Sequence, residues 1–164
     1  MARGRSTESV PAFEPRMTTL VLRGGHIDTI HTHLLRAYPE EGCGVLLGSE
    51  HDGRREITRV VAFANQREDS RHNRYTISPE QFLAAERESR QHGVDVLGFF
   101  HSHPDHPAQP SAFDLDHAWP YYSYLIVSVS QGRIDTMRSF RLTDDRSSFE
   151  PETLEMPRLA TGNS

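Results

Sequence analysis

The sequence predicts an α+β fold of the sandwich type, in which a mainly antiparallel, mixed sheet is flanked by helices. Short apolar runs of strand length recur between turn signals along most of the chain. Two longer segments between these runs carry apolar residues at helical spacing. The 164 residues suffice for one domain with a core of its own. Strands interleaved with two longer helices therefore favour a sheet with helices on its flanks.

The start of the chain predicts an extension, a strand and a helix. Residues 1–16 are polar and show neither a strand nor a helix period, so we expect a disordered extension before a domain that spans residues 17–150. Residues 18–23 favour a strand, and a glycine pair then leads into a helix that Pro39 ends. One face of this helix is apolar: Ile27, Ile30, Leu34 and Tyr38.

The next segment predicts two strands, a loop and the second helix. Residues 42–48 form a continuous apolar run, which is typical of a strand buried on both faces. After a turn, residues 56–64 favour another strand, and the charged residues 66–74 favour a surface loop. Residues 75–77 indicate a brief strand. Ser78, followed by proline at the first helical position, begins a helix that continues to about residue 92.

The second half of the chain predicts more strands and one short helix. Three strands are expected, over residues 95–100, 122–129 and 134–142. A short helix is expected over residues 111–119, with Ser111 as its N-cap. The chain from residue 143 onward is acidic and contains proline, so we expect it to fray and residues 151–164 to form a flexible tail.

Two histidines separated by one residue follow the strand at residues 95–100. In an extended chain, His101 and His103 place both imidazoles on the same side, which is the geometry that a shared metal ion needs. A loop stiffened by prolines can return Asp114 to the same point, and Ser111 shares the first turn of the following helix with it. Two nitrogens, one carboxylate oxygen and room for a water match the donor set of a catalytic zinc site.

This run of His-Ser-His, seven residues, Ser, two residues and Asp resembles the signature of the JAMM (MPN+) metallopeptidases at every defining position. That family also uses a glutamate on an earlier strand, typically followed by any residue, Cys and Gly, and Glu41 in Glu-Gly-Cys-Gly fits this pattern. The resemblance extends from about residue 18 to about residue 150, and the motif region is most similar to the short, stand-alone prokaryotic members. It implies an MPN-like α+β fold.

The resemblance also implies a role for each motif residue. His101, His103 and Asp114 would hold zinc, one ion per chain. Glu41 would take the proton of the attacking water and pass it to the leaving amine, and Ser111 would stabilise the tetrahedral oxyanion.

Other polar residues have both functional and structural interpretations. Five residues are candidates for contacting the substrate or supporting the metal ligands: Cys43, Asn65, Tyr75, His106 and His117. The structural alternatives are a small buried thiol for Cys43, a turn for His106 and its neighbour Asp105, and a surface position for His117. His31 and His33 form a second His-x-His pair, but residues two apart in a helix point about 200° apart, so we expect both to be solvated.

Aromatic residues gather after the predicted short helix. They are Trp119, Tyr121, Tyr122 and Tyr124. We expect them in the core and at its rim, although an aromatic wall beside the cleft could hold a peptide.

The resemblance implies a peptidase that cuts at or near the C-terminal Gly-Gly of a ubiquitin-like protein. The short prokaryotic members trim or deconjugate small sulfur carriers with a ubiquitin fold, and the short connection between Asp114 and Tyr122 lacks the insertion with which eukaryotic deubiquitinases grip a distal ubiquitin. A sulfur carrier or prokaryotic ubiquitin-like protein is therefore the favoured partner. A catalytically silent MPN scaffold and thiol catalysis by Cys43 are the alternatives, and a homodimer remains open.

Composition excludes several other classes of function. A formal net charge of -5 argues against a nucleic-acid partner, which would favour a basic face. No apolar run approaches the roughly 20 residues of a membrane span. A single cysteine gives no disulfide framework, and the N-terminal residues lack the apolar segment of a signal peptide, so we expect a cytoplasmic protein.

Overall fold

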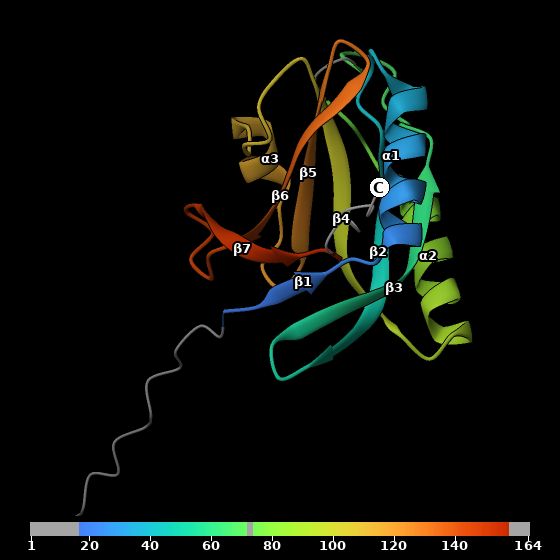
Figure 1. Ribbon diagram of the computed structural model, residues 1–164, viewed down its shortest axis with the longest axis vertical. Helices are drawn as coiled ribbons and strands as arrows, with labels where there is room; N and C mark the ends of the chain where they lie inside the picture. Colours follow the sequence, from blue (N-terminus) through green and yellow to red (C-terminus); the bar gives the residue numbers. More distant parts are fainter. Residues whose placement is uncertain (1–16, 72–73, 158–164) are drawn as a thin grey trace, which may run out of the picture.

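The computed structural model describes residues 17–71 and 74–157, and this part of the chain forms seven strands and three helices. Figure 1 shows how they are arranged. The strands are β1 (Thr19–Val21), β2 (Cys43–His51), β3 (Arg54–Phe63), β4 (Asp95–Pro104), β5 (Ser123–Ser130), β6 (Arg133–Leu142) and β7 (Phe149–Glu155). The helices are α1 (Gly24–Ala37), α2 (Pro79–Gln91) and α3 (Ala112–His117).

The strands form one sheet in the order β1-β3-β2-β4-β5-β6-β7, which closes because β1 pairs with both β3 and β7. The pairs that involve β1 are parallel, as is β4 with β5, whereas β2-β3, β2-β4, β5-β6 and β6-β7 are antiparallel. Helices α1 and α2 lie beside β2 and β3, and α3 lies on the other side of β4 and β5 (Figure 1). The predicted α+β class is confirmed, including the mixed and mainly antiparallel sheet.

Strand β2 is buried on both faces, as its continuous apolar run predicted. Leu46 packs into the main core with Ile30 and Leu34 of α1. Its neighbours Val45 and Leu47 point to the opposite face and pack with Ala85 of α2. Helix α2 begins where expected, because Ser78 and Gln81 form a reciprocal capping box around its first turn, in which Pro79 is the first residue.

The prediction that the chain frays after residue 143 is wrong for residues 149–155. Strand β7 pairs with β6 on one side and β1 on the other, so it completes the sheet instead of forming part of a flexible tail. The acidic composition was misleading because one of the acidic residues of β7, Glu152, points into the protein. Glu152 is buried and accepts hydrogen bonds from the hydroxyls of Thr18, Ser123 and Ser139. The rest of the predicted tail, residues 158–164, and the predicted extension, residues 1–16, lie outside the described residues.

Two further expectations are wrong. Residues 75–77 form no strand, because the backbone of Thr76 bonds to the side chain of Asn65 and to Gln66 instead of to a neighbouring strand. His31 and His33 are half-buried and not solvated, since α1 packs against β3 and β6. His33 Nε2 lies 3.0 Å from two main-chain carbonyl oxygens, one on β2 and one on β3.

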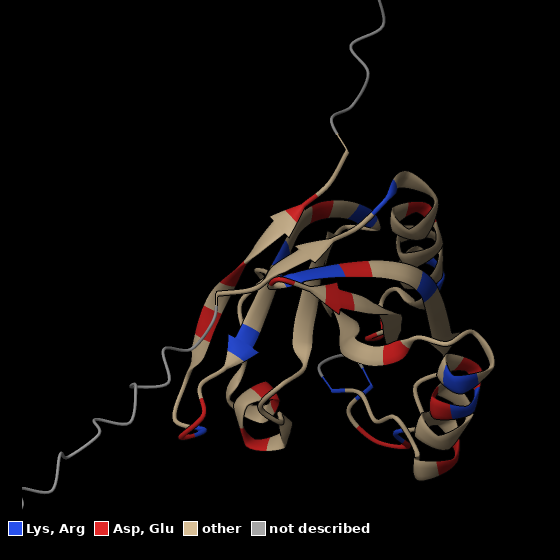
Figure 2. Cartoon of the chain, turned by 90° about the horizontal axis from the view of Figure 1, so that it is seen from below, with Lys and Arg blue, Asp and Glu red and all other residues tan. Residues whose placement is uncertain are grey.

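Charged residues of both signs occur on strands and helices alike. Figure 2 shows acidic and basic residues interspersed along the strands and helices, with neither sign confined to one face. Within residues 17–71 and 74–157, no helix combines the length and the apolar character that crossing a membrane requires.

Candidate active site

The two histidines of the motif lie on β4 itself, which continues to Pro104 and not only to the predicted residue 100. Because they are two residues apart on a strand, their imidazoles share a face, and their Nε2 atoms are 3.2 Å apart. The first turn of α3 brings Asp114 to them. Its Oδ1 lies 3.2 Å from His101 Nε2, and its Oδ2 lies 3.2 Å from His103 Nε2. All three side chains are buried.

The orientation of His103 is fixed by its second ring nitrogen. Nδ1 lies 2.9 Å from the carbonyl oxygen of Pro107, which can only accept a hydrogen bond. Nδ1 therefore carries the proton, and the lone pair of Nε2 faces His101 and Asp114. The ring of His101 stacks on Tyr75 with centroids 4.5 Å apart, and its buried Nδ1 has no hydrogen-bond partner among the described residues.

The three groups fit a metal ion. Donors that lie 2.0–2.1 Å from a tetrahedral zinc are about 3.3 Å from one another, and the spacings here are 3.2 Å. Burial disfavours the charged form of Asp114, but the attraction of His101 and the hydrogen bonds around the carboxylate outweigh it and hold the pKa of Asp114 below its usual value. The cluster can thus present two neutral nitrogens and one anionic oxygen to a cation.

A capping box joins Ser111 to the carboxylate of the cluster. Ser111 Oγ accepts from the main-chain N–H of Asp114 at 3.0 Å, and Asp114 Oδ2 accepts from the main-chain N–H of Ser111 at 2.8 Å. The predicted N-cap is confirmed. The same reciprocal pair that begins α3 therefore aims the Asp114 carboxylate at the histidines.

Glu41 lies at the entrance of β2 and is 4% exposed. The pairing of Cys43 with His101 brings this end of β2 beside the cluster, where Glu41 Oε1 is 4.0 Å from His103 Nε2. Burial raises the pKa of Glu41 to about 7, while the imidazoles of His101 and His103 act in the opposite direction. A carboxylate therefore borders the donor cluster without being one of its three members.

A family model for prokaryotic homologs of the JAB domain matches residues 24–143. The chain belongs to this family. A probable TtuB-protein conjugate cleaving protease of Thermus thermophilus is 32% identical over 120 residues, which are 73% of this chain and 74% of that protein. The CysO-cysteine peptidase of Mycobacterium bovis is 31% identical over 133 residues, 80% of this chain and 88% of that protein.

The fold is equally shared with a protein of Desulfitobacterium hafniense whose structure was solved in solution. That structure matches with a TM-score of 0.74 at 30% identity and covers 87% of this chain and 95% of the other. The resemblance to the JAMM peptidases is confirmed, and this JAB domain is a hydrolase of the peptidase class.

Ser102, between the two histidines, was not singled out from the sequence. Its Oγ accepts from the N–H of Gly42 at 2.9 Å, and its N–H donates to the carbonyl of Gly42 at 3.0 Å. These bonds tie the entrance of β2 to β4 and hold Glu41 near His103. A serine between two histidines on a strand faces away from them. This alternation was the only sequence feature that could have pointed to Ser102.

Asn65 lies at the main chain of Glu41, and Tyr75 lies against the ring of His101. Asn65 Nδ2 donates to the carbonyls of Glu41 at 3.2 Å and Arg74 at 2.9 Å, and its Oδ1 accepts from the N–H groups of Arg67 and Thr76. One amide therefore closes the base of the loop after β3 and anchors it to Glu41.

Cys43, His106 and His117 lie in three different environments. Cys43 is buried, and burial, together with Glu41, raises the pKa of its thiol to about 12. The side chain of His106 is exposed, and its carbonyl accepts from Ser128 at 2.6 Å. His117 is exposed, stacks on Phe113 with centroids 4.0 Å apart, and lines the groove beside Asp114.

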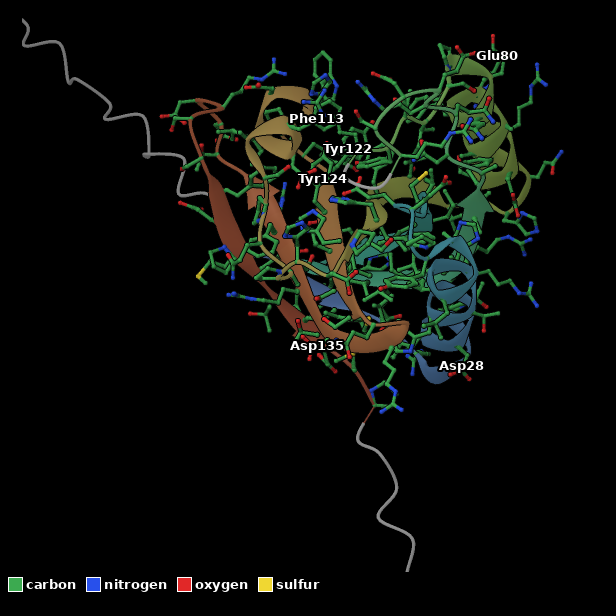
Figure 3. The ribbon with its side chains drawn as sticks, turned by 90° about the horizontal axis from the view of Figure 1, so that it is seen from above. Asp28, Glu80, Phe113, Tyr122, Tyr124 and Asp135 are labelled. Atoms are coloured by element: carbon green, nitrogen blue, oxygen red, sulfur yellow. The ribbon has the colours of Figure 1, made fainter. Side chains whose placement is uncertain are left out.

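A groove of about 890 Å³ adjoins the cluster of His101, His103 and Asp114, and Asp114 forms part of its wall. One side is formed by residues 75–79 and Phe82, and the other by α3 and the segment that follows it. Figure 3 shows Phe113 on α3, with Tyr122 and Tyr124 near it at the same end of the molecule. The volume is that of a site for a ligand of several hundred Å³.

Proposed function

We propose that this JAB peptidase is zinc-dependent and cleaves at or near the C-terminal Gly-Gly of a ubiquitin-like or sulfur-carrier protein. The observation that carries the proposal is the buried cluster of His101, His103 and Asp114, with Glu41 Oε1 4.0 Å from one of its nitrogens. A donor set with a free-standing carboxylate at its edge is what metal-assisted hydrolysis of an amide requires.

When bound, zinc would polarise the scissile carbonyl and lower the pKa of a water molecule. Glu41 takes the proton of the attacking water and later donates it to the leaving amine. Its burial keeps bulk water from competing for that proton, and the bonds from Asn65 and Ser102 to residues 41–42 hold it in place. The side-chain hydroxyl of Ser111 uses only an acceptor lone pair for the cap, so its proton is free to be donated to the developing oxyanion.

The relatives and the shape of the site support the proposed substrate class. The relatives are named for TtuB-protein conjugates and for CysO-cysteine. In the first name a protein is joined to TtuB, and in the second a cysteine is joined to CysO. The connection from α3 to β5 is only Ala118–Tyr122, so nothing there can enclose a second folded domain. A flexible tail lying in the groove fits better, with glycine where the backbone must pass close to the metal.

The test uses purified, zinc-loaded protein and ubiquitin-like carriers extended beyond Gly-Gly by a short peptide. Mass spectrometry should detect carriers that end in Gly-Gly, whereas matched carriers with Ala-Ala in place of Gly-Gly should stay intact. A chelator should stop cleavage, and added zinc should restore it. Undiminished cleavage in the chelator would contradict zinc dependence, and binding of a carrier without any cleavage would support a silent scaffold.

A further inference from the structure

Next to Phe99, which precedes His101 by two residues on β4, the groove is walled by aromatic side chains that remain partly in solvent. Trp119 is 59% exposed and Tyr121 is 50% exposed, and Tyr122 stands beside them with its ring centroid 5.2 Å from that of Tyr121. Large apolar side chains are usually withdrawn from water when a fold permits it. Their position in the wall of a groove that reaches Asp114 indicates a surface for contact with a ligand.

Tyr121 is held in a fixed position. Its backbone has φ 87°, which is strained for any residue except glycine. Its carbonyl accepts from Arg141 Nη2 at 3.0 Å, and the guanidinium carbon of Arg55 lies 4.9 Å from its ring centroid. Arg55 itself is 1% exposed and bonded to Leu97 and Ser123 inside the sheet. The ring is thus preorganised for contact, which reduces the entropy lost on binding.

The charges around this wall select the kind of side chain that it can take. Arg55 already lies over the ring of Tyr121, and Arg146 lies over that of Trp119 at 4.6 Å. Asp114 is the one carboxylate among the residues that line the groove, and it is one of the three candidate metal ligands. An added lysine or arginine would therefore meet these cations, and the carboxylate of Glu86, which faces Tyr122, is already paired with Arg90 at 3.8 Å. An aliphatic or aromatic side chain would instead bury apolar surface.

We propose that Trp119, Tyr121 and Tyr122 form a subsite for one bulky apolar side chain in the tail of the carrier, before the glycines, and that Tyr121 determines this specificity. The inference rests on the proposed function. The carrier's tail is the occupant because each of the two named relatives acts on conjugates of one carrier, TtuB or CysO. A rigid aromatic wall matched to a single kind of side chain therefore fits the carrier, on the acyl side of the scissile bond.

The experiment measures binding separately from cleavage. Trp119 is the only tryptophan in the chain, so its fluorescence reports on this wall directly. Zinc-loaded Glu41→Gln protein is titrated with peptides that contain Gly-Gly and carry Phe, Leu, Ala or Arg at each of the three positions before it. At one of these positions, Phe and Leu should bind about tenfold more tightly than Ala, and Arg no more tightly than Ala.

Variants at Tyr121 test its role. Tyr121→Gly removes the ring and suits the positive φ, so loss of the preference cannot be ascribed to backbone strain. In it the Phe-to-Ala ratio should fall to about one, while Tyr121→Phe should keep the ratio. Leu83→Ala is the control, because Leu83 is 43% exposed on α2 but outside the groove. Melting temperatures identify any variant that fails to fold.

Three results would overturn the proposal: tight binding of the Arg peptides, a Phe preference that survives in Tyr121→Gly, or a Tyr121-dependent preference for apolar residues placed after Gly-Gly. Failure of the proposed function is a separate outcome, because it appears as absence of cleavage by the active protein whether or not the peptides bind.

Discussion

The Nδ1 atom of His103 is held 2.9 Å from the carbonyl oxygen of Pro107, in the turn that follows β4. This hydrogen bond directs the lone pair of Nε2 toward His101 and Asp114, so the protein fixes the ring before any metal arrives. The loop between β4 and α3 therefore both returns Asp114 to the cluster and orients one of the two histidines.

Removal of His103 should abolish metal binding. With His103→Ala, two of the three donors remain, and we expect the zinc content to fall from about one ion per chain to a small fraction of it. Metal analysis of purified protein checks this. His117→Ala is the matched control, because His117 is exposed and stacks on Phe113, and it should keep its zinc. Full zinc occupancy in His103→Ala would show that the cluster is not the metal site.

Glu41→Gln should keep fold and zinc but lose turnover by at least about 100-fold, because an amide cannot accept the proton of the attacking water. Turnover on a Gly-Gly-extended carrier, melting temperature and zinc content together check this. Glu40→Gln is the control, since Glu40 is the exposed neighbour. If Glu40→Gln were inactive and Glu41→Gln active, the proton transfer would have been assigned to the wrong residue.

Ser111→Ala should affect stability and turnover together. Loss of the cap should cost about 1 kcal/mol of the free energy of unfolding, and loss of the oxyanion donor should lower turnover on the order of 100-fold. Ser111→Asp separates these effects, because aspartate caps helices but cannot donate a hydrogen bond when ionised. We expect it to fold and to turn over slowly.

Zinc content must be measured in both Ser111 variants, because Ser111 shares its capping box with Asp114 and a new carboxylate could also bind the metal. Wild-type turnover in a folded, zinc-loaded Ser111→Ala or Ser111→Asp would restrict Ser111 to its structural role.

Thiol reagents should leave the enzyme active. Cys43 is buried, and its pKa is raised to about 12, so almost no thiolate exists near neutral pH. Iodoacetamide at neutral pH should neither label the folded protein nor slow cleavage, and Cys43→Ala should retain turnover. A chelator provides the positive control for inhibition. Inactivation that follows stoichiometric labelling of Cys43 would instead support thiol catalysis.

Local sequence was sufficient where the spacing of residues fixes geometry. His101 and His103 share a face because any strand places alternate side chains on one side, and Ser111 caps α3 because its offset from Asp114 is that of a capping box. The apolar run in β2 likewise predicted burial on both faces. These relationships involve neighbours in the chain and need no knowledge of the rest of the fold.

Local sequence failed where a distant partner decides the outcome. The acidic composition of β7 predicted a flexible segment. The prediction failed because the three hydroxyls that bond to Glu152 come from β1, β5 and β6 or their ends, and no local pattern reveals them. His33 was predicted to be solvated from its helical spacing. That prediction failed because the carbonyl oxygens near its ring belong to β2 and β3, which are distant in the chain. In both cases the polar side chain is buried with long-range hydrogen bonds, which composition alone cannot anticipate.

The sequence by itself determined the donor set of the site, its family and the strand and helix that carry it. Only the tertiary structure decided how close Glu41 comes to His103, that Tyr75 stacks on His101, and that Arg55 and Arg141 hold Tyr121 at the rim of the groove. The physical reason is that these contacts join segments far apart in the chain, and closure of the sheet by β1 and β7 sets their distances.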